Sequence, residues 1–141
     1  MKFEEARPFM EKNHRAVIST YQANGAMQTS IVVSGAYQGN AAFVIVRGDS
    51  AKTRNLRRDP RCTVMAVDND WRDYTVVEGQ AQLKDYHNTP AEEFRVLLRD
   101  VFRACGDNDH PDWEEYDQAM VKQDAVVVCV TPDRVYGKLR G

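Results

Sequence analysis

Six short runs of strand-forming residues, several joined by tight turns, constrain the fold of this chain more than any other feature. The runs cover residues 16–21, 28–34, 41–47, 61–67, 74–83 and 125–130. Asn24-Gly25 and Gly39-Asn40 separate the first three runs, and such pairs are typical of hairpin turns. Links this short favour antiparallel pairing, and a barrel removes most of the free edges. We therefore expect a mainly β fold, a six-stranded antiparallel barrel.

Details of the strands refine this expectation. Gly79 lies inside the fifth run, where it indicates a bulge or a close backbone approach. Pro132 is expected to close the sixth strand, because proline cannot donate to the hydrogen-bond ladder. Val135-Tyr136 is expected to add a last extended contact.

Short helices are expected at the crossovers. Gly48-Asp49-Ser50 opens the first, with Asp49 or Ser50 as its cap, and Pro60 ends it. Thr89–Glu93 carries start signals for the second. Its apolar stripe is Phe94, Leu97, Leu98, Val101, Phe102 and Cys105, with Gly106 as the stop. A third is expected over residues 112–122, where Trp113, Tyr116 and Met120 form a packing stripe.

Composition excludes several classes of protein. A length of 141 residues with 43% apolar residues fits one domain over 1–141. The net charge of -2 provides no global field that would attract nucleic acid or an anionic membrane. The apolar runs are too short to span a bilayer, and the N-terminus lacks the apolar stretch of a secretory signal. We expect a cytoplasmic protein that binds neither nucleic acid nor membrane.

Metal and nucleophile chemistry is not indicated. Cys62, Cys105 and Cys129 lie far apart among apolar neighbours and are interpreted as buried thiols. The histidines are His14, His87 and His110, which lack the spacing of a zinc site, so no metal is expected. The loop over residues 107–112 is interpreted as helix-capping rather than calcium-binding. No catalytic acid or base is assigned, because each candidate depends on burial that the sequence does not show.

Residues 50–61 carry the strongest functional signal. Five cations gather there against Asp59, namely Lys52, Arg54, Arg57, Arg58 and Arg61. Helical geometry turns Arg54, Arg58 and Arg61 outward, whereas Lys52 shares the face of Leu56 that meets the barrel.

A lysine on that inner face needs an anion, because an unpaired ammonium is costly to bury. Lys52 also stands in the first turn, where backbone amides and the helix dipole attract phosphate. The alternative is a solvated basic helix. Nucleic acid is disfavoured because no aromatic residues are interleaved with the cations, and neither a Rossmann nor a P-loop motif is present.

Four segments in order carry a resemblance to a known family. They read Ala51-Lys-Thr-Arg-Asn-Leu-Arg-Arg-Asp-Pro-Arg61, Glu78-Gly-Gln-Ala-Gln-Leu83, Asp112-Trp-Glu-Glu-Tyr-Asp-Gln-Ala-Met120 and Val135-Tyr-Gly137. The chain resembles the pyridoxamine 5'-phosphate oxidase-like, FMN-binding split barrels. It is most similar to their branch that uses the deazaflavin coenzyme F420.

The resemblance implies a homodimer with the cofactor between two protomers. Lys52 would hold the cofactor phosphate with the help of Ser50 and Arg54. Ring contacts are implied for residues on the second and third strands, namely Gln28, Ser30, Ile45, Val46 and Arg47. Trp71 and Tyr74 would approach from the partner chain. Met27 stands where many relatives have a proline.

The function that this resemblance implies is an oxidoreductase, most closely a reductase of a small conjugated organic substrate that uses reduced coenzyme F420. One alternative keeps the fold and uses FMN in an oxidase or reductase. Another is a non-catalytic cofactor-binding or carrier protein.

Overall fold

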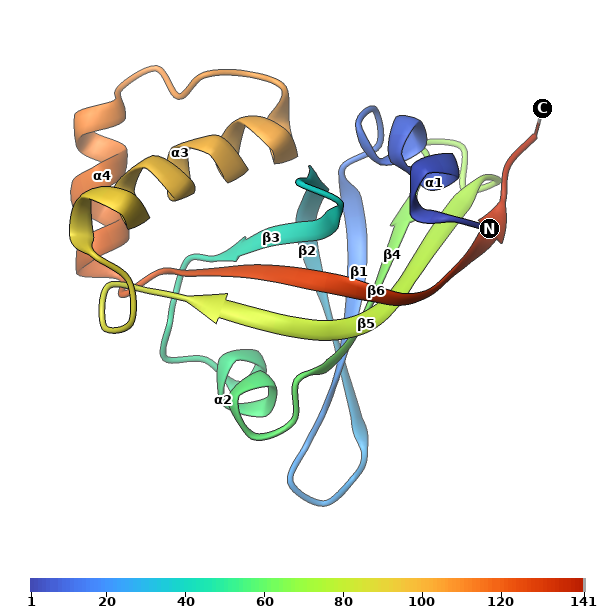
Figure 1. Cartoon of the computed structure of the whole chain (residues 1–141), viewed down its shortest axis with the longest axis horizontal. Helices are drawn as coiled ribbons and strands as arrows, with labels where there is room; N and C mark the ends of the chain where they lie inside the picture. Colours follow the sequence, from blue (N-terminus) through green and yellow to red (C-terminus); the bar gives the residue numbers. More distant parts are fainter. Residues whose placement is uncertain (141) are drawn as a thin grey trace.

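Six antiparallel strands form a closed barrel in the computed structural model, which describes residues 1–140 (Figure 1). They are β1 (Arg15–Tyr21), β2 (Met27–Tyr37), β3 (Asn40–Ile45), β4 (Arg61–Val67), β5 (Tyr74–Lys84) and β6 (Val126–Lys138). Their order around the barrel is β1-β2-β3-β6-β5-β4, and β4 pairs again with β1. The mainly β, six-stranded antiparallel barrel predicted from the sequence is confirmed. The expected domain ends at Gly141, which lies outside the described residues.

Alternation along the strands fills the barrel. In β1 the side chains of Ala16 and Ile18 are buried inside, and β4 contributes Val64 and Ala66 in the same way. Phe43 of β3 is fully buried in the same core. Every second residue faces inward in a strand, so this pattern fixes the register of each pairing.

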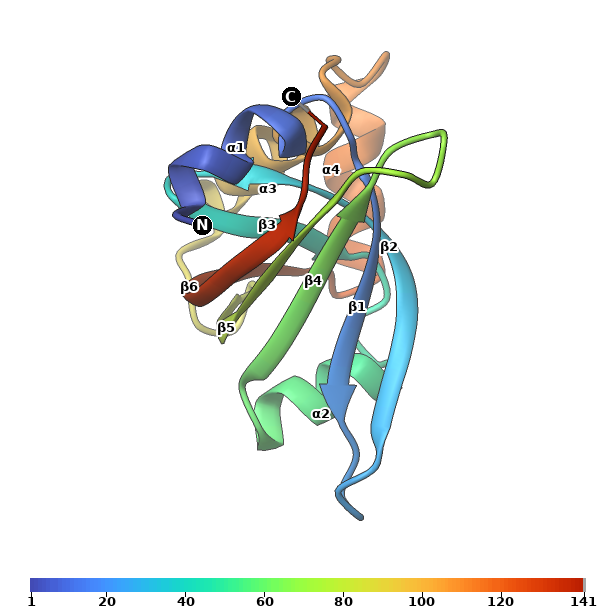
Figure 2. The same ribbon diagram turned by 90° about the vertical axis from the view of Figure 1, so that its right-hand side faces the viewer.

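Helices cover both ends and one side of the barrel. They are α1 (Phe3–Met10), α2 (Ala51–Arg58), α3 (Ala91–Gly106) and α4 (Trp113–Lys122). Figure 2 shows α1 and α2 at opposite ends of the barrel. No helix among residues 1–140 has the length and apolar character needed to cross a membrane.

The three predicted helices are present, and α1 is an addition to them. It buries Ala6 and Met10 against the barrel core. The stripe on α3 packs on the barrel as predicted, and it forms a second core with Tyr116 and Met120 of α4. Because this helix pair covers the outer face of β3 and β6, residues 125–128 of the chain are buried on both faces.

β6 is longer than predicted. The expected end at Pro132 is wrong, because the strand continues to Lys138. Pro132 pairs with Gly79, beside a register shift between Glu78 and Gly79. The register shift interrupts the hydrogen-bond ladder at the position where proline has no N–H to donate. The strand therefore continues past Pro132. The bulge predicted at Gly79 is confirmed.

Gly79→Ala is expected to destabilise the barrel. A Cβ atom at this position would lie 1.9 Å from the carbonyl oxygen of Thr131, which is backbone and cannot move aside alone. We expect the free energy of unfolding in urea to fall by about 1–3 kcal/mol, as for other overpacked sites. Gly106→Ala is the control, because a Cβ atom there meets nothing within 4 Å. Equal stability of the two variants would contradict the close approach.

Candidate functional site

The start of α2 is fixed by contacts on both sides. The amide of Gly48 donates to the carbonyl of Gln123 at 3.1 Å, and a Cβ atom on Gly48 would lie 1.9 Å from the carbonyl oxygen of Asp124. Ser50 then caps the helix by accepting a hydrogen bond from the amide of Thr53 at 3.4 Å. Of the two predicted caps, Ser50 is therefore the one used. The first turn of α2 is held against the turn between α4 and β6.

A groove opens beside this helix start, where β2 and β3 separate. β2 pairs with β3 only over Ser34–Tyr37, whereas its earlier residues, Met27–Val33, pair with β1 alone. The space between the two strands and the first turn of α2 has a volume of about 540 Å³. We call it the α2 groove. Its walls are Ile31, Val32, Val44, Ile45, Val46, Arg47, Asp49, Ser50, Ala51, Lys52 and Arg54.

Lys52 and Arg47 are the cations of the α2 groove that form no ion pair among residues 1–140, and Lys52 is the one in the first turn of α2. Its side chain is half-buried, and it forms no ion pair with any of residues 1–140. Arg54 also lines the groove, but its guanidinium pairs with Asp49 at 2.9 Å. With Arg47, the groove holds three cations and one carboxylate at the N-terminus of a helix. This end of the groove therefore attracts an anion.

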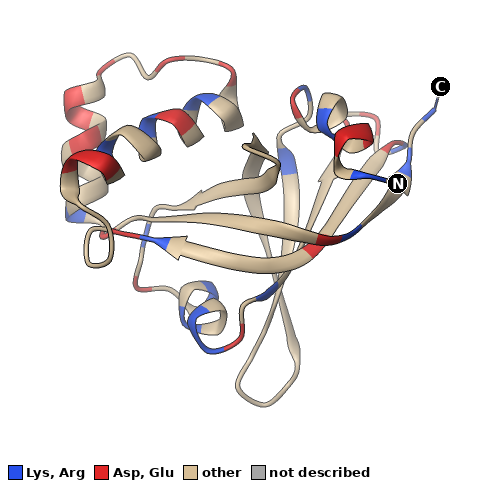
Figure 3. Cartoon of the chain, in the orientation of Figure 1, with Lys and Arg blue, Asp and Glu red and all other residues tan. Residues whose placement is uncertain are grey.

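The outward arginines have other partners. Figure 3 shows the basic residues gathered along α2. Arg61 pairs with Asp59 at 2.6 Å and lies over the ring of Tyr21 at 4.1 Å from its centroid. Arg58 donates to the carbonyl of Tyr21 at 3.2 Å. The predicted helical stripe is wrong for Arg61, because α2 ends at Arg58 and Arg61 is the first residue of β4. Arg54, Arg58 and Arg61 all contact protein groups, whereas the ammonium of Lys52 forms no ion pair with residues 1–140.

Six of the ten residues expected at the site line the α2 groove, namely Ile45, Val46, Arg47, Ser50, Lys52 and Arg54. The other four lie elsewhere. Gln28 and Ser30 are half-buried on the face of β2 opposite to Ile31, and neither is a wall of the groove. Trp71 and Tyr74 belong to the turn and first residue of the β4–β5 hairpin, at the end of the barrel away from α2 (Figure 2).

Asn55 explains the position of Gln28. This asparagine is 5% exposed, and its amide donates to Oε1 of Gln28 at 2.7 Å and to Oγ1 of Thr20 at 3.1 Å. The contacts join α2 to the β1–β2 hairpin. The sequence analysis missed this residue, although an asparagine inside a short helix is unfavourable and indicates a tertiary partner.

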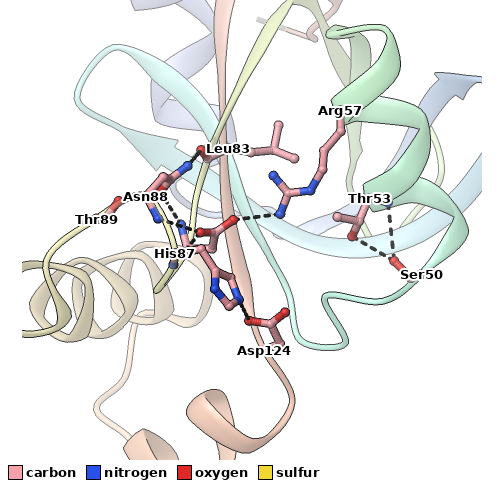
Figure 4. A network of polar contacts seen from close by, with 9 residues as sticks. Ser50, Thr53, Arg57, Leu83, His87, Asn88, Thr89 and Asp124 are labelled. Atoms are coloured by element: carbon pink, nitrogen blue, oxygen red, sulfur yellow. Dashed lines mark hydrogen bonds and ion pairs between the residues drawn. The ribbon is translucent and has the colours of Figure 1, made fainter.

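Arg57 joins α2 to a second segment. Its guanidinium lies 2.7 Å from Oδ2 of Asp85, whose side chain is only 3% exposed. Asp85 also accepts hydrogen bonds from the amides of His87 at 2.8 Å and Asn88 at 3.0 Å. Burial favours the protonated acid, but the hydrogen bonds from Arg57 and the two amides outweigh it and lower the pKa of Asp85. Figure 4 shows the network, including the neighbouring pair of His87 and Asp124 at 2.9 Å.

The thiols and histidines lie outside the α2 groove. Burial raises the pKa of Cys62 and of Cys105 to about 12, so both are neutral thiols at pH 7. Cys129 is half-buried. His14 bridges the carbonyl of Ser34 at 2.8 Å and Asp107 at 2.6 Å. In the loop between α3 and α4, Asp107 caps the end of one helix and Asp112 caps the start of the next, which confirms the helix-capping interpretation.

The fold and the groove together define a barrel protein with a cation-lined groove between β2, β3 and the start of α2. The family model described as pyridoxamine 5'-phosphate oxidase matches residues 3–139. The chain therefore belongs to the pyridoxamine 5'-phosphate oxidase family, as the resemblance implied. Flavin-type cofactors are the ligands of this family.

Solved structures share the fold at low sequence identity. A conserved hypothetical protein from Mycobacterium tuberculosis is 19% identical with a TM-score of 0.76, over 97% of this chain and 84% of that one. A structure named F420 reductase is 17% identical with a TM-score of 0.63, over 92% of this chain and 94% of that one. A putative pyridoxamine 5'-phosphate oxidase from Listeria innocua is 14% identical with a TM-score of 0.64, over 96% of each chain.

Asp85→Asn is expected to lower stability at neutral pH. The variant keeps the shape of the side chain but removes the charge that Arg57 and two amides contact. We expect a loss of about 1.5–3 kcal/mol in the free energy of unfolding at pH 7, typical of hydrogen bonds to a charged group.

The same variant tests the pH dependence. A lowered carboxyl pKa stabilises the fold above the unfolded value of about 3.9, and this contribution disappears as the pH falls through the folded pKa. The stability difference between wild type and Asp85→Asn should therefore shrink from pH 7 to pH 2.5 in urea titrations. A difference that stays constant over this range would contradict the assignment.

Proposed function

We propose that the chain is a single cofactor-binding domain over residues 1–141 and acts as an oxidoreductase. It binds coenzyme F420 in the α2 groove and reduces a small conjugated organic molecule. The observation that carries this proposal is the unpaired ammonium of Lys52 at the start of α2. Membership of a family whose cofactors are flavin-type supports it.

The groove matches the two parts of such a cofactor. Lys52 and the free amides of the first turn bind the phosphate, while Ser50 and Arg54 border it. The ring would lie along Val46 and Arg47, which follow Ile45, the last paired residue of β3. Their backbone groups are therefore available to orient it. When bound, the reduced deazaflavin supplies the hydride, and the groove contributes binding and orientation.

FMN is the alternative cofactor. Lys52 recognises a phosphate group, which FMN and coenzyme F420 both carry, and the family is named for a pyridoxamine 5'-phosphate oxidase. An FMN-dependent oxidase or reductase would use the same groove. A cofactor carrier would use it as well, and such a protein would bind the reduced cofactor without turnover.

A second copy of this chain would complete the site. Met27, Ile31 and Val33 face outward on β2 and are 54%, 84% and 58% exposed. Three exposed apolar side chains in one row favour an interface rather than a solvated surface. Because Ile31 also lines the α2 groove, a partner on this row would lie next to the cofactor.

Trp71 fits a role on the partner side. It is 74% exposed, and its backbone has a φ of 61°, which is unusual for a bulky residue. The turn is held by Asp68, which accepts from the amide of Arg72 at 3.0 Å, and by Arg140, which pairs with Asp73 at 2.8 Å. A fixed turn that extends a tryptophan into solvent supports the proposed contact of Trp71 and Tyr74 with the groove of the other protomer.

Lys52→Ala is expected to weaken binding of coenzyme F420 and of FMN. Loss of a charge-assisted hydrogen bond worth about 1.5–3 kcal/mol lowers affinity roughly 10- to 100-fold. Fluorescence titration with each cofactor measures this affinity. The cofactor that the wild type binds more tightly is identified as its ligand. Lys12→Ala is the control, because it removes the same charge from an exposed site remote from α2. Unchanged affinity of Lys52→Ala for both cofactors would contradict the proposed binding of the phosphate by Lys52.

Ile31→Asp is expected to dissociate the proposed dimer. Burying a carboxylate in an apolar interface is unfavourable, so the variant should sediment as a monomer at concentrations where the wild type sediments as a dimer. Val121→Asp is the matched control, since Val121 is 59% exposed on α4. A wild-type protein that is monomeric at about 100 µM in sedimentation velocity would contradict this part of the proposal.

A further inference from the structure

A second cavity lies against the α2 groove, between the barrel and the helix pair α3 and α4. Its volume is about 300 Å³, and it is formed by two strands and two helices. The lining residues are Val33, Val44, Val46, Phe102, Cys105, Gly106 and Tyr116. We call it the helix cavity. We propose that the helix cavity binds the substrate, and that this substrate is a small, uncharged, planar aromatic or conjugated molecule.

The position of the cavity follows from β3. Val44 and Val46 face the same side of this strand because side chains alternate, and both of them line the helix cavity and the α2 groove. The helix cavity and the α2 groove therefore adjoin each other at these two valines. This inference rests on the proposed function, because it identifies the substrate side of the same site.

The lining determines the chemical class. Cys105 donates its thiol hydrogen to the carbonyl of Ala42 at 3.4 Å, and Tyr116 donates its hydroxyl to the carbonyl of Leu98 at 3.4 Å. Burial keeps both groups neutral by raising the pKa of each side chain. The remaining lining side chains are apolar. A charged guest would lose its hydration without a partner, so the cavity selects an uncharged molecule.

The shape of the cavity favours a flat guest. Phe102 is held by edge-to-face contacts with Tyr116 at 5.1 Å and Trp113 at 5.5 Å between ring centroids. Gly106 lies one turn further along the same face of α3 and leaves space beside the ring of Phe102, because a Cβ atom there would meet nothing within 4 Å. The volume is at the lower end of the range for small-molecule sites, about 300–1,000 Å³. One or two fused rings match such a space.

Calorimetric titration with a matched pair of probes tests this inference. Methyl 2-naphthoate is neutral, and 2-naphthoate is its anionic counterpart. We expect the wild type to bind the ester at least tenfold more tightly than the anion. Gly106→Leu should weaken binding of the ester at least tenfold, because its side chain fills the cavity. Ala119→Leu adds bulk on the exposed face of α4 and should leave ester binding within twofold of the wild type.

Each outcome decides the inference. Equal affinity for the two probes, or an unchanged ester affinity in Gly106→Leu, would overturn it, as would the absence of ester binding to the wild type. If Gly106→Leu does not fold, Gly106→Met places a more flexible side chain in the same space and should give the same loss. Titration of the wild type with coenzyme F420 and FMN is a separate arm. Failure of that arm alone would reject the proposed cofactor and leave the cavity assignment standing.

Discussion

Closure of the barrel is the constraint on which the rest of the structure depends. Pairing of β1 with both β2 and β4 completes the barrel, and within this closed sheet β2 and β3 pair over only four residues. The same closure separates β3 from β4, which are consecutive in the chain, so the chain crosses one end of the barrel as α2. The gap between β2 and β3 and the start of this helix therefore occur together. A closed sheet of this order produces the groove without any residue dedicated to making it.

Electrostatics then distinguishes one cation from its neighbours. The arginines on α2 contact Asp49, Asp85 or the carbonyl of Tyr21, and the contacts of Arg57 with Asp85 and of Arg58 with Tyr21 join the helix to other segments. Lys52 has no carboxylate partner among residues 1–140 and shares the groove with the amides of the first turn. A phosphate would supply the missing partner, which is why a basic helix in a chain of net charge -2 is interpreted as a ligand site.

Much of this architecture could be predicted from the sequence, because strand alternation, turn residues and helix caps are local signals. Local signals were sufficient to predict the helix start at Ser50, the helix face that carries Lys52 and the bulge at Gly79. Contacts between distant segments could not be predicted in this way. Asn55 contacts Gln28 across 27 positions, and Arg57 contacts Asp85 across 28, and no local pattern encodes either pair. The predicted strand end at Pro132 was wrong, because the missing N–H of proline ends a strand only where the ladder needs a hydrogen bond from that residue. The spacing of Phe3, Ala6 and Met10 would have predicted α1.

The central claim is that the ammonium of Lys52 binds the phosphate of a flavin-type cofactor in the α2 groove. A crystal structure of the protein grown with coenzyme F420, and in parallel with FMN, tests it most directly. The account predicts a phosphate oxygen about 2.7–2.9 Å from Nζ of Lys52 at the start of α2, with the ring along Val46 and Arg47. A phosphate bound elsewhere, with the ammonium of Lys52 directed into solvent, would contradict it.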